Sequence, residues 1–235
     1  MPLLEGKGVT KYFGGLAALK DVDFEIEEGE IVGLIGPNGS GKTTLLNCIS
    51  GVLVPTSGRI YFLGQDITGL KPHKICKLGI GRTFQIPRPF MNMTVLENAM
   101  VCTDGDRERA LEAVRHVNLE EKINVLAKTL TFHERRRLEI ARALAVNPKI
   151  ILLDEVAAGL NPKEIVEFTG LIRKIRDELG ITILWVEHVM KAIMTTAERI
   201  IVLNKGTKIT EGTPKEVAEN PEVIEAYLGE EYKID

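Results

Sequence analysis

The sequence predicts an α/β protein in which an antiparallel β segment precedes a parallel sheet that carries a helical insertion. Residues 22–27 alternate between apolar and polar side chains, as in a half-exposed antiparallel strand. The continuous apolar run at 31–35 is typical of a strand buried in a parallel sheet, and residues 150–153 and 181–186 are two more predicted buried strands. Between the first two of these strands, residues 87–147 carry apolar side chains at helical spacing, which predicts the insertion.

The first part of the predicted sheet surrounds a glycine-rich turn. After the strand at 22–27, the chain turns at residues 28–30, which are Glu-Gly-Glu. The apolar strand at 31–35 follows this turn. The glycine-rich residues 36–41 follow, and we expect a helix over 42–50 that ends at a glycine.

The second part repeats the order of strand, helix and strand. The strand at 150–153 is followed by a helical segment over 162–179 and by the strand at 181–186. This order predicts right-handed crossovers and therefore a parallel sheet. One more short helix is expected at 221–228.

The chain is expected to form a single domain, residues 1–235, with two parts. Residues 1–86 and 148–235 form the α/β core with its antiparallel β subdomain, and residues 87–147 form an α-helical subdomain. The helices expected in the insertion are 95–101, 107–117 and 134–146.

The composition excludes several classes of protein. Of 235 residues, 44% are hydrophobic and 27% charged, and the net charge is −3, so bulk positive charge cannot attract nucleic acid. No apolar run approaches the ~20 residues that span a bilayer. The start of the chain lacks a secretory signal pattern, and Cys48, Cys76 and Cys102 stand far apart, so we expect reduced thiols and a cytosolic location.

Residues 36–43 fit the pattern G-x-x-x-x-G-K-[ST] directly after a predicted buried strand and before a predicted helix. Its glycines let successive backbone N–H groups face inward as an anion-binding nest, and the helix N-terminus adds partial positive charge. A glycine-rich turn could match by chance, but the eight positions and both flanks favour a nucleoside triphosphate site. The candidate ATP-binding residues are Gly36, Pro37, Asn38, Gly39, Ser40, Gly41, Lys42, Thr43 and Thr44.

Three side chains at the end of this motif have separate expected roles. Lys42 reaches the β- and γ-phosphates, Thr43 coordinates Mg²⁺, and Thr44 contacts the α-phosphate. The motif therefore predicts both a nucleotide and a magnesium ion.

Two carboxylates end the apolar run at 150–153. Asp154 can hold the water shell of the Mg²⁺ ion, and Glu155 can polarise the attacking water. An Asp-Glu pair could instead merely begin a loop. The apolar run, however, directs both acids to the carboxyl edge of the sheet, where ligands bind in such folds.

Two fragments resemble GTPase motifs and are expected to be turns. Residues 66–69 match D-x-x-G but follow no buried strand, and residues 204–207 end in threonine where guanine recognition requires aspartate. The long separation between Lys42 and Asp154 also argues against a small GTPase.

With these motifs in place, the chain resembles the ATPase subunits of ABC transporters over essentially its whole length, which implies a P-loop NTPase core of the RecA-like type. Gln85, in Arg-Thr-Phe-Gln, matches the Q-loop glutamine, which implies a Mg²⁺ ligand that also senses the transmembrane partner. His188, at the end of the last apolar run, matches the switch histidine, which implies contact with the γ-phosphate and the attacking water.

The resemblance implies further positions at the nucleotide and at a dimer interface. Gly159, Leu160 and Asn161 match the D-loop, which crosses that interface. Phe13 matches the aromatic residue that stacks on adenine; Tyr12 is the second candidate, and a packing role in the core stays open for either.

The stretch of this chain that matches the family's signature departs from the usual Leu-Ser-Gly-Gly-Gln. Here Leu is followed by Thr131, Phe132, His133 and Glu134, so the hydroxyl is kept but both glycines are replaced. Side chains there oppose close approach of backbone N–H groups to phosphate, so we hypothesise a weak signature in an isolated homodimer. Alternatively, the side chains point away while the N–H groups still donate.

Several stretches narrow the resemblance to the ATPases of branched-chain amino-acid importers, the Liv type and its LivG-like branch. These stretches are residues 13–19, 82–85, 157–162 and 226–229. The resemblance implies a peripheral subunit on the cytoplasmic face of the membrane that uses ATP and Mg²⁺. Its partners would be permease subunits, a second ATPase subunit in a homo- or heterodimer and, indirectly, an extracytoplasmic solute-binding protein.

Three alternatives stay open at this point. The cargo could be urea or an amide, or the chain could serve lipopolysaccharide export. It could also be an ATP-binding regulatory switch with little hydrolysis. A soluble ABC protein that acts on DNA or ribosomes is disfavoured, because the chain has one phosphate-binding motif and no long heptad run.

Overall fold

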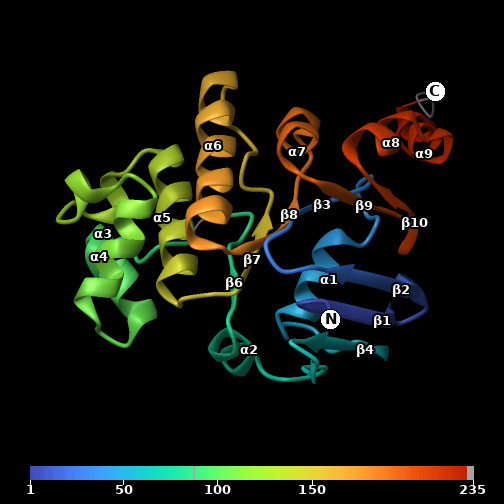
Figure 1. Cartoon of the computed structure of the whole chain (residues 1–235), viewed down its shortest axis with the longest axis horizontal. Coiled ribbons are helices and arrows are strands. Elements are labelled where there is room, and N and C mark those ends of the chain that lie inside the picture. The colour runs from blue at the N-terminus through green and yellow to red at the C-terminus, as the bar shows by residue number, and fades with distance from the viewer. Residues whose placement is uncertain (87, 232–235) are drawn as a thin grey trace.

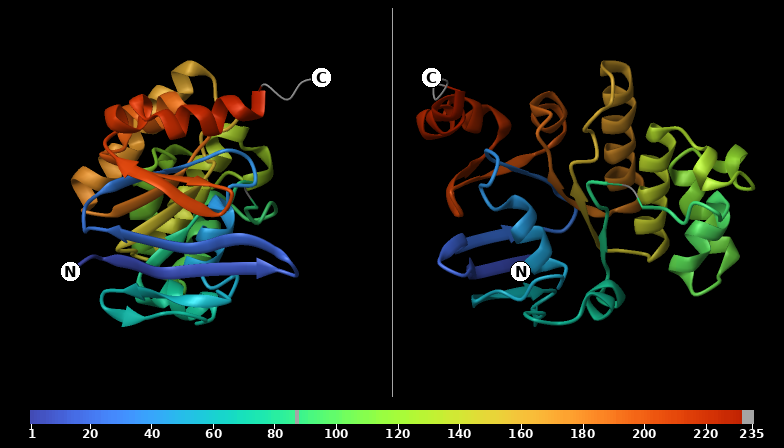
Figure 2. Two further views of the ribbon diagram at one scale, coloured as in Figure 1. Left: turned by 90° about the vertical axis from the view of Figure 1, so that its right-hand side faces the viewer. Right: turned by 180° about the vertical axis from the view of Figure 1, so that it is seen from behind.

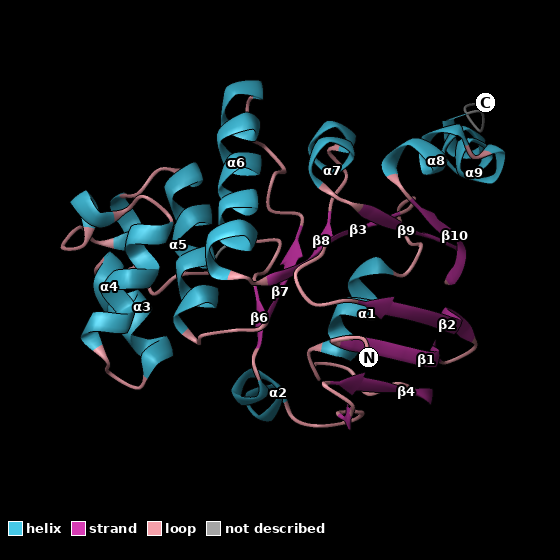
Figure 3. Ribbon diagram, viewed as in Figure 1, coloured by secondary structure: helices cyan, strands magenta, loops and turns pink. Residues whose placement is uncertain are grey.

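The computed structural model describes residues 1–86 and 88–231 and contains two β-sheets, with helices on both faces of the larger one (Figures 1 and 3). Pro87, the expected first residue of the helical subdomain, and residues 232–235, at the end of the expected core, lie outside the described residues. The strands are β1 (Leu4–Phe13), β2 (Leu16–Ile26), β3 (Ile31–Ile35), β4 (Ser57–Phe62), β5 (Gln65–Asp66), β6 (Ile80–Arg82), β7 (Ile150–Asp154), β8 (Thr182–Val186), β9 (Arg199–Asn204) and β10 (Thr207–Gly212). The α-helices are α1 (Lys42–Ile49), α2 (Pro72–Leu78), α3 (Val95–Met100), α4 (Arg107–His116), α5 (Phe132–Ala145), α6 (Pro162–Leu179), α7 (Met190–Thr196), α8 (Pro214–Glu219) and α9 (Pro221–Glu231), and short 3₁₀ helices occupy Val101–Thr103, Glu120–Lys122 and Ala127–Thr129.

The larger sheet has the strand order β10-β9-β3-β8-β7-β6. Strands β9, β3, β8, β7 and β6 run parallel to one another, and β10 is antiparallel to β9. The predicted parallel sheet is therefore confirmed. Its strand β3, which precedes the glycine-rich turn, lies between β8 and β9, so the carboxyl ends of strands distant in sequence meet at one edge.

Both faces of this sheet are buried. Along β3, Ile31 and Ile35 belong to the core shared with the larger helices, and Val32 and Leu34 belong to a second core on the opposite face. Helices α5, α6 and α7 lie on the first face, and α1 with the antiparallel sheet lies on the second (Figure 1). This burial on both sides explains why the strands read as uninterrupted apolar runs.

The smaller sheet is antiparallel and has the order β2-β1-β4-β5. The strand predicted at 22–27 is the second half of β2, which begins earlier, at Leu16, and pairs with β1 as a long hairpin (Figure 2). The hairpin closes where Phe13 pairs with Leu16.

Helices α3, α4 and α5 pack together at one end of the molecule, as expected for the insertion (Figure 1). Helix α5 begins at Phe132 rather than at the predicted Glu134, because Thr131 caps it: the Thr131 hydroxyl accepts from the Glu134 N–H at 3.3 Å. Helix α3 ends one residue early, at Met100, where the chain tightens into a 3₁₀ turn. The boundaries at 87 and 147 stay a prediction.

The two GTPase-like fragments are turns, as predicted. Asp66 Oδ1 accepts a hydrogen bond from the Thr68 N–H at 2.8 Å, which closes a local turn. Residues 204–207 connect β9 to β10, and Lys205 and Gly206 both have positive φ, as this tight hairpin requires.

The C-terminal helices α8 and α9 lie beside β10 (Figure 1). The helix predicted at 221–228 is α9, which extends to Glu231. As far as the structure describes the chain, none of its helices combines the length and the apolar character needed to cross a bilayer.

Candidate functional site

The glycine-rich turn connects β3 to α1 at the carboxyl edge of the parallel sheet. Gly36 has φ +152°, and a Cβ atom there would lie 2.0 Å from the carbonyl oxygen of Leu203. Gly41 has φ +105°, and a Cβ atom there would lie 2.5 Å from the carbonyl oxygen of Ala18. Both positions therefore exclude a side chain, and the turn is held between β9 and β2.

Lys42 extends back into this turn. Its Nζ donates to the carbonyl oxygens of Gly36 at 2.7 Å and Pro37 at 2.9 Å, and the side chain is buried. The ammonium therefore lies within the loop that the sequence predicts to hold phosphates. Around it, Ser40 is buried, Gly41 and Thr44 are half-buried, and Asn38, Gly39 and Thr43 are exposed.

Asp154 lies at the end of β7 and forms a buried ion pair with Arg82 on the neighbouring strand β6. Arg82 Nη2 is 3.1 Å from Asp154 Oδ2, and Arg82 Nη1 donates to Ser50 Oγ at 2.6 Å. Burial raises the pKa of the Asp154 carboxyl and lowers the pKa of the Arg82 guanidinium, while the charge of each partner opposes the shift of the other. Asp154 Oδ1 is buried and has no hydrogen-bond partner among the residues that the structure describes.

Glu155 joins two distant side chains. Its Oε1 is 2.7 Å from His188 Nε2, and its Oε2 accepts a hydrogen bond from Gln85 Nε2. The backbone of Glu155 has φ +50°, and its N–H donates to the Val186 carbonyl at 2.9 Å. The fold thus brings together three residues from the ends of β6, β7 and β8 that the sequence proposed separately.

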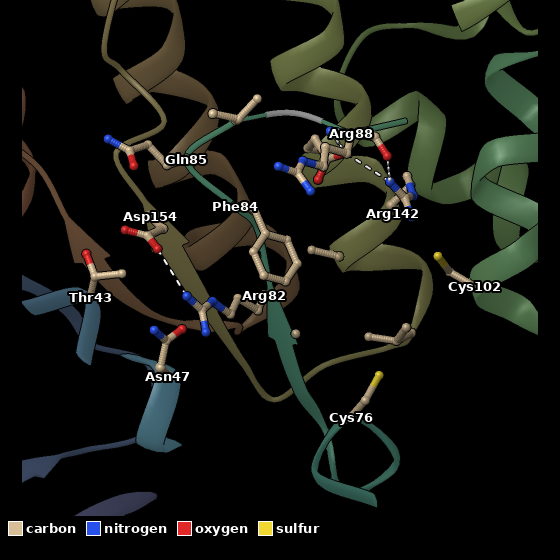
Figure 4. A pocket seen from close by; sticks show the side chains of 15 residues that line it. Thr43, Asn47, Cys76, Arg82, Phe84, Gln85, Arg88, Cys102, Arg142 and Asp154 are labelled. Carbon is tan, nitrogen blue, oxygen red and sulfur yellow. Dashed lines mark hydrogen bonds and ion pairs between the residues drawn. The ribbon is translucent and has the colours of Figure 1, made fainter. Parts of the chain in front are cut away.

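The three proposed metal ligands lie around one space. Figure 4 shows Thr43, Gln85 and Asp154 near one another, with Arg82 below Asp154. They border a cavity of about 600 Å³ that continues from the sheet edge toward α5 and is also lined by Phe84, Ile86, Arg88 and Arg142.

The signature residues lie at the start of α5. The Thr131 hydroxyl and the Glu134 carboxylate cap the helix reciprocally. The Phe132 ring is half exposed, and the Arg136 guanidinium lies 5.0 Å from its centre. His133 Nδ1 is 3.9 Å from a Glu164 carboxylate oxygen, and His133 Nε2 accepts from Arg137 Nε at 3.3 Å.

These contacts connect the signature to the D-loop of the same chain. A Cβ atom at Gly159 would lie 3.5 Å from the Phe132 ring. Glu164, the neighbour of His133, accepts from the Asn161 N–H at 2.8 Å, and Asn161 caps α6. Gly159 and Asn161 are exposed, and Leu160 is half-buried.

Phe13 lies at the tip of the β1–β2 hairpin. Its side chain is 47% exposed, which disfavours the packing role in the core. Lys11 Nζ lies 5.4 Å from the centre of the ring, and Tyr12 is also exposed.

Three charged residues of this region had no predicted role: Arg82, Arg136 and Glu187. All three are buried or nearly so, and Arg136 Nη1 donates to the Phe84 carbonyl beside Gln85 at 3.3 Å. A charged residue directly after an apolar strand can be recognised in the sequence as a candidate site residue. Glu187, which follows β8, is such a residue. Arg82 and Arg136 lie in segments whose burial only the packing reveals.

The fold and the site define a P-loop nucleotide-binding ATPase. The family described as "ABC transporter" matches residues 19–158, and the family described as "Branched-chain amino acid ATP-binding cassette transporter" matches residues 207–233. The chain belongs to the ABC transporter family, as one of its ATP-binding cassettes.

Curated relatives cover nearly the whole chain. BraF of Pseudomonas aeruginosa and LivG of Escherichia coli, both high-affinity branched-chain amino acid transport ATP-binding proteins, are each 43% identical over 97% of this chain and 98% of their own length. LptB of Acidithiobacillus ferridurans, a lipopolysaccharide export system ATP-binding protein, is 34% identical over 99% of both chains.

Solved ABC cassettes share the fold. The ADP conformation of the ATP-binding cassette MJ1267 has a TM-score of 0.90 and 33% identity over 97% of this chain and 99% of its own. A dimeric cassette bound to ADP and Pi, MJ0796, has a TM-score of 0.80 and 34% identity over 90% of this chain and 98% of its own.

Proposed function

We propose that this chain is the ATP-hydrolysing subunit of an ABC importer for branched-chain amino acids. One observation carries the hydrolytic part of the proposal: Glu155 lies between Gln85 and His188, at the same edge of the parallel sheet as the loop that follows β3. The higher identity to BraF and LivG than to LptB, together with the match of residues 207–233, supports the amino-acid cargo over lipopolysaccharide.

The loop at 36–44 binds the triphosphate in this proposal. Lys42 exchanges its bonds to the Gly36 and Pro37 carbonyls for the β- and γ-phosphates, and the N-terminus of α1 adds positive potential. Thr44 contacts the α-phosphate, and the exposed Phe13 ring stacks on adenine.

The residues present fit a magnesium ion. Thr43, Gln85 and Asp154 supply the oxygen ligands that Mg²⁺ prefers, and Asp154 Oδ1 is buried without another partner among the described residues. The described residues contain no cluster of three His, Cys, Asp or Glu side chains suited to a metal, as expected where substrate phosphates complete the coordination. When bound, the ion would neutralise charge on the phosphates.

Two of the side chains act on the attacking water. Glu155 accepts the proton of the water, and His188 holds the γ-phosphate and the water in line. In the structure these two side chains contact each other at 2.7 Å, so the geometry that orients one also orients the other. Gln85 connects this pair to the segment that borders the cavity.

The working unit in this proposal is a dimer. Thr131, Phe132, His133 and Glu134 of one subunit face the nucleotide of the other, and Gly159, Leu160 and Asn161 cross the interface. The likeness to a dimeric cassette supports this arrangement. The second subunit is either a copy of this chain or a different ATPase.

We further propose that a permease docks at the cavity between the sheet edge and α5. The cavity has exposed apolar side chains at its rim, Phe84 and Ile86, and it adjoins Gln85. A permease seated there would hold this chain at the cytoplasmic face of the membrane, and the permease would link it to an extracytoplasmic solute-binding protein.

The hydrolytic proposal is tested with Glu155→Gln. The amide cannot accept a proton, so we expect ATP turnover to fall by a factor of ~10²–10⁴ while ATP affinity is kept. Glu178→Gln, on the exposed side of α6, is the control and should hydrolyse ATP at the wild-type rate. Turnover that survives in Glu155→Gln would assign the base to another residue.

The cargo is tested by uptake in cells that lack this chain. Uptake of labelled leucine should be lost and should return with the wild-type gene, whereas uptake of labelled urea should be unaffected. Loss of urea uptake alone would favour the alternative cargo.

A further inference from the structure

Glu187 is a buried carboxylate between two loops of the site, and it has no role in the chemistry proposed above. Its side chain is 1% exposed, at the end of β8 and directly before His188. A buried charge is costly unless it is hydrogen-bonded, so its position requires an explanation.

The carboxylate accepts three backbone hydrogen bonds, two from the residues that follow it and one from a distant segment. Oε2 accepts from the N–H groups of His188 at 3.0 Å and Val189 at 3.2 Å. Oε1 accepts from the N–H of Ala157 at 2.5 Å, thirty residues away in the chain. Burial raises the pKa of Glu187, and these three bonds oppose the rise because they favour the ionised form.

Each of the two segments carries part of the proposed site. Ala157 lies two residues after Glu155, and its carbonyl accepts from the N–H of Leu160 in the D-loop at 3.2 Å. On the other side, His188 contacts Glu155 at 2.7 Å. One carboxylate therefore holds the loop with the histidine and the segment that joins the glutamate to the D-loop.

The signature helix approaches the same charge. Arg136 on α5 is buried, and burial lowers its pKa while the Glu187 carboxylate acts most strongly against that decrease. The environment of Glu187 thus includes a cation from a third element.

We infer that Glu187 is a positioning residue that couples the His188 loop to the segment between Glu155 and the D-loop. Through both loops it fixes the relative placement of His188 and Glu155, so that the two side chains move as one unit. This inference rests on the proposed function for its effect on turnover, but the coupling itself is a property of the fold.

The test compares Glu187→Gln with Glu198→Gln in the full chain. Gln at 187 keeps the shape but turns an NH₂ group toward at least one backbone donor, which breaks one side of the link. Glu198 is the matched control, because its carboxylate also accepts a backbone hydrogen bond, from the N–H of Ile31 at 3.2 Å. Ile31 begins β3, at the end of the strand away from the glycine-rich turn.

We expect Glu187→Gln to lower kcat by about 10- to 100-fold, the range that small misplacements of reacting groups cause. The KM for ATP should stay within about three-fold of wild type, because Glu187 holds the segments at 157 and 188–189, whereas the Lys42 ammonium is held by the Gly36 and Pro37 carbonyls. Peptides that contain Ala157 and His188–Val189 should both exchange amide hydrogens faster. Glu198→Gln should change none of these values.

Three results would overturn the inference: an unchanged kcat in folded Glu187→Gln, faster exchange in only one of the two segments, or an equal loss of kcat in Glu198→Gln. If Glu187→Gln does not fold, amide hydrogen exchange of the wild-type chain tests the inference instead. Its amides at Ala157, His188 and Val189 should open with one common free energy, and separate values would contradict the coupling. A wild-type chain without ATP hydrolysis would refute the proposed function, while the exchange measurement would still decide the role of Glu187.

Discussion

Lys42 carries the positive charge at the centre of the phosphate-binding loop. Its side chain is already ordered and buried within the loop, where the ammonium bonds to two carbonyls that the phosphates would replace. A preorganised charge loses little entropy on binding, which makes it more effective than a flexible surface lysine.

We expect Lys42→Ala to weaken ATP binding by about 100-fold or more, because a hydrogen bond to a charged group contributes ~1.5–3 kcal/mol and Lys42 is proposed to contact two phosphates. Isothermal titration calorimetry measures the loss. Lys174→Ala, on the exposed face of α6, should bind ATP as the wild type does. Equal affinities in the two variants would remove Lys42 from the site.

The ion pair between Arg82 and Asp154 has a different role, because both side chains are buried. We expect Arg82→Met to lower the free energy of unfolding by about 3–5 kcal/mol, since it leaves the Asp154 carboxylate without a cation. The matched control is Arg59→Met, which removes an exposed pair with Asp66 and should cost less than about 1 kcal/mol.

Urea denaturation of the two variants measures both values. A similar small loss in both would mean that water or another group solvates Asp154 after the substitution. Adding Asp154→Asn to Arg82→Met should recover part of the lost stability, because it removes the unpaired charge.

At the scale of the element, the start of α5 explains how the chain accommodates the altered signature. The capping box of Thr131 and Glu134 fixes the helix start, and the backbone N–H groups of its first turn lie along the axis. The His133 side chain lies beside Glu164 of α6 and accepts a hydrogen bond from Arg137, one turn further along α5. This geometry favours the alternative in which the side chains point away from the phosphate.

We therefore expect that Phe132→Gly with His133→Gly leaves ATP turnover and dimerisation at the wild-type level. The two glycines should lower the free energy of unfolding by about 1 kcal/mol from helix propensity, because Phe and His are already weaker helix formers than Ala. Steady-state ATPase assays and thermal unfolding measure the two effects. An increase in both turnover and dimerisation would instead support the hypothesis of a weak signature.

The control for this variant is Arg107→Gly with Glu108→Gly, at the same first two positions of α4. Its propensity cost is somewhat larger, because Arg and Glu are better helix formers than Phe and His, and it lacks the contacts to the D-loop. Any excess loss of stability in the α5 variant then measures the contacts of Phe132 with Gly159 and of His133 with Glu164.

In the whole molecule, the loop proposed to bind nucleotide follows β3, and the proposed signature begins α5 in the helical part (Figure 1). If both roles hold, a single chain has two half-sites, and a head-to-tail dimer would complete both. ATP that persists between two subunits stabilises their association by mass action.

We expect Glu155→Gln to form an ATP-dependent dimer, because it keeps the nucleotide but does not hydrolyse it. Light scattering should report about twice the 26.0 kDa mass of one chain with ATP and the single mass without it. Lys42→Ala combined with Glu155→Gln is the control, and it should stay monomeric with ATP. A monomer under every condition would point to a different ATPase as the natural partner.

The features of this protein that are contiguous in the chain could be predicted from its amino-acid sequence. The loop at 36–43 and the acids at the end of β7 were predictable, because a phosphate nest and a strand that aims two carboxylates are local patterns. The buried strands β3, β7 and β8 and the helix α6 were predictable because burial on both faces, or on one helical face, imposes a fixed period on apolar residues.

Which of these residues contact one another depends on the packing of the folded chain. Strands β1, β6 and β10 carry weak patterns and acquire their conformation from pairing with neighbours, and none of them was predicted. The contacts of Glu155 with Gln85 and His188, the pair of Arg82 with Asp154 and the bond of Glu187 to Ala157 all join segments that are distant in sequence. Such contacts depend on strand order and on which charges the packed core can bury, and no local period in the sequence encodes either.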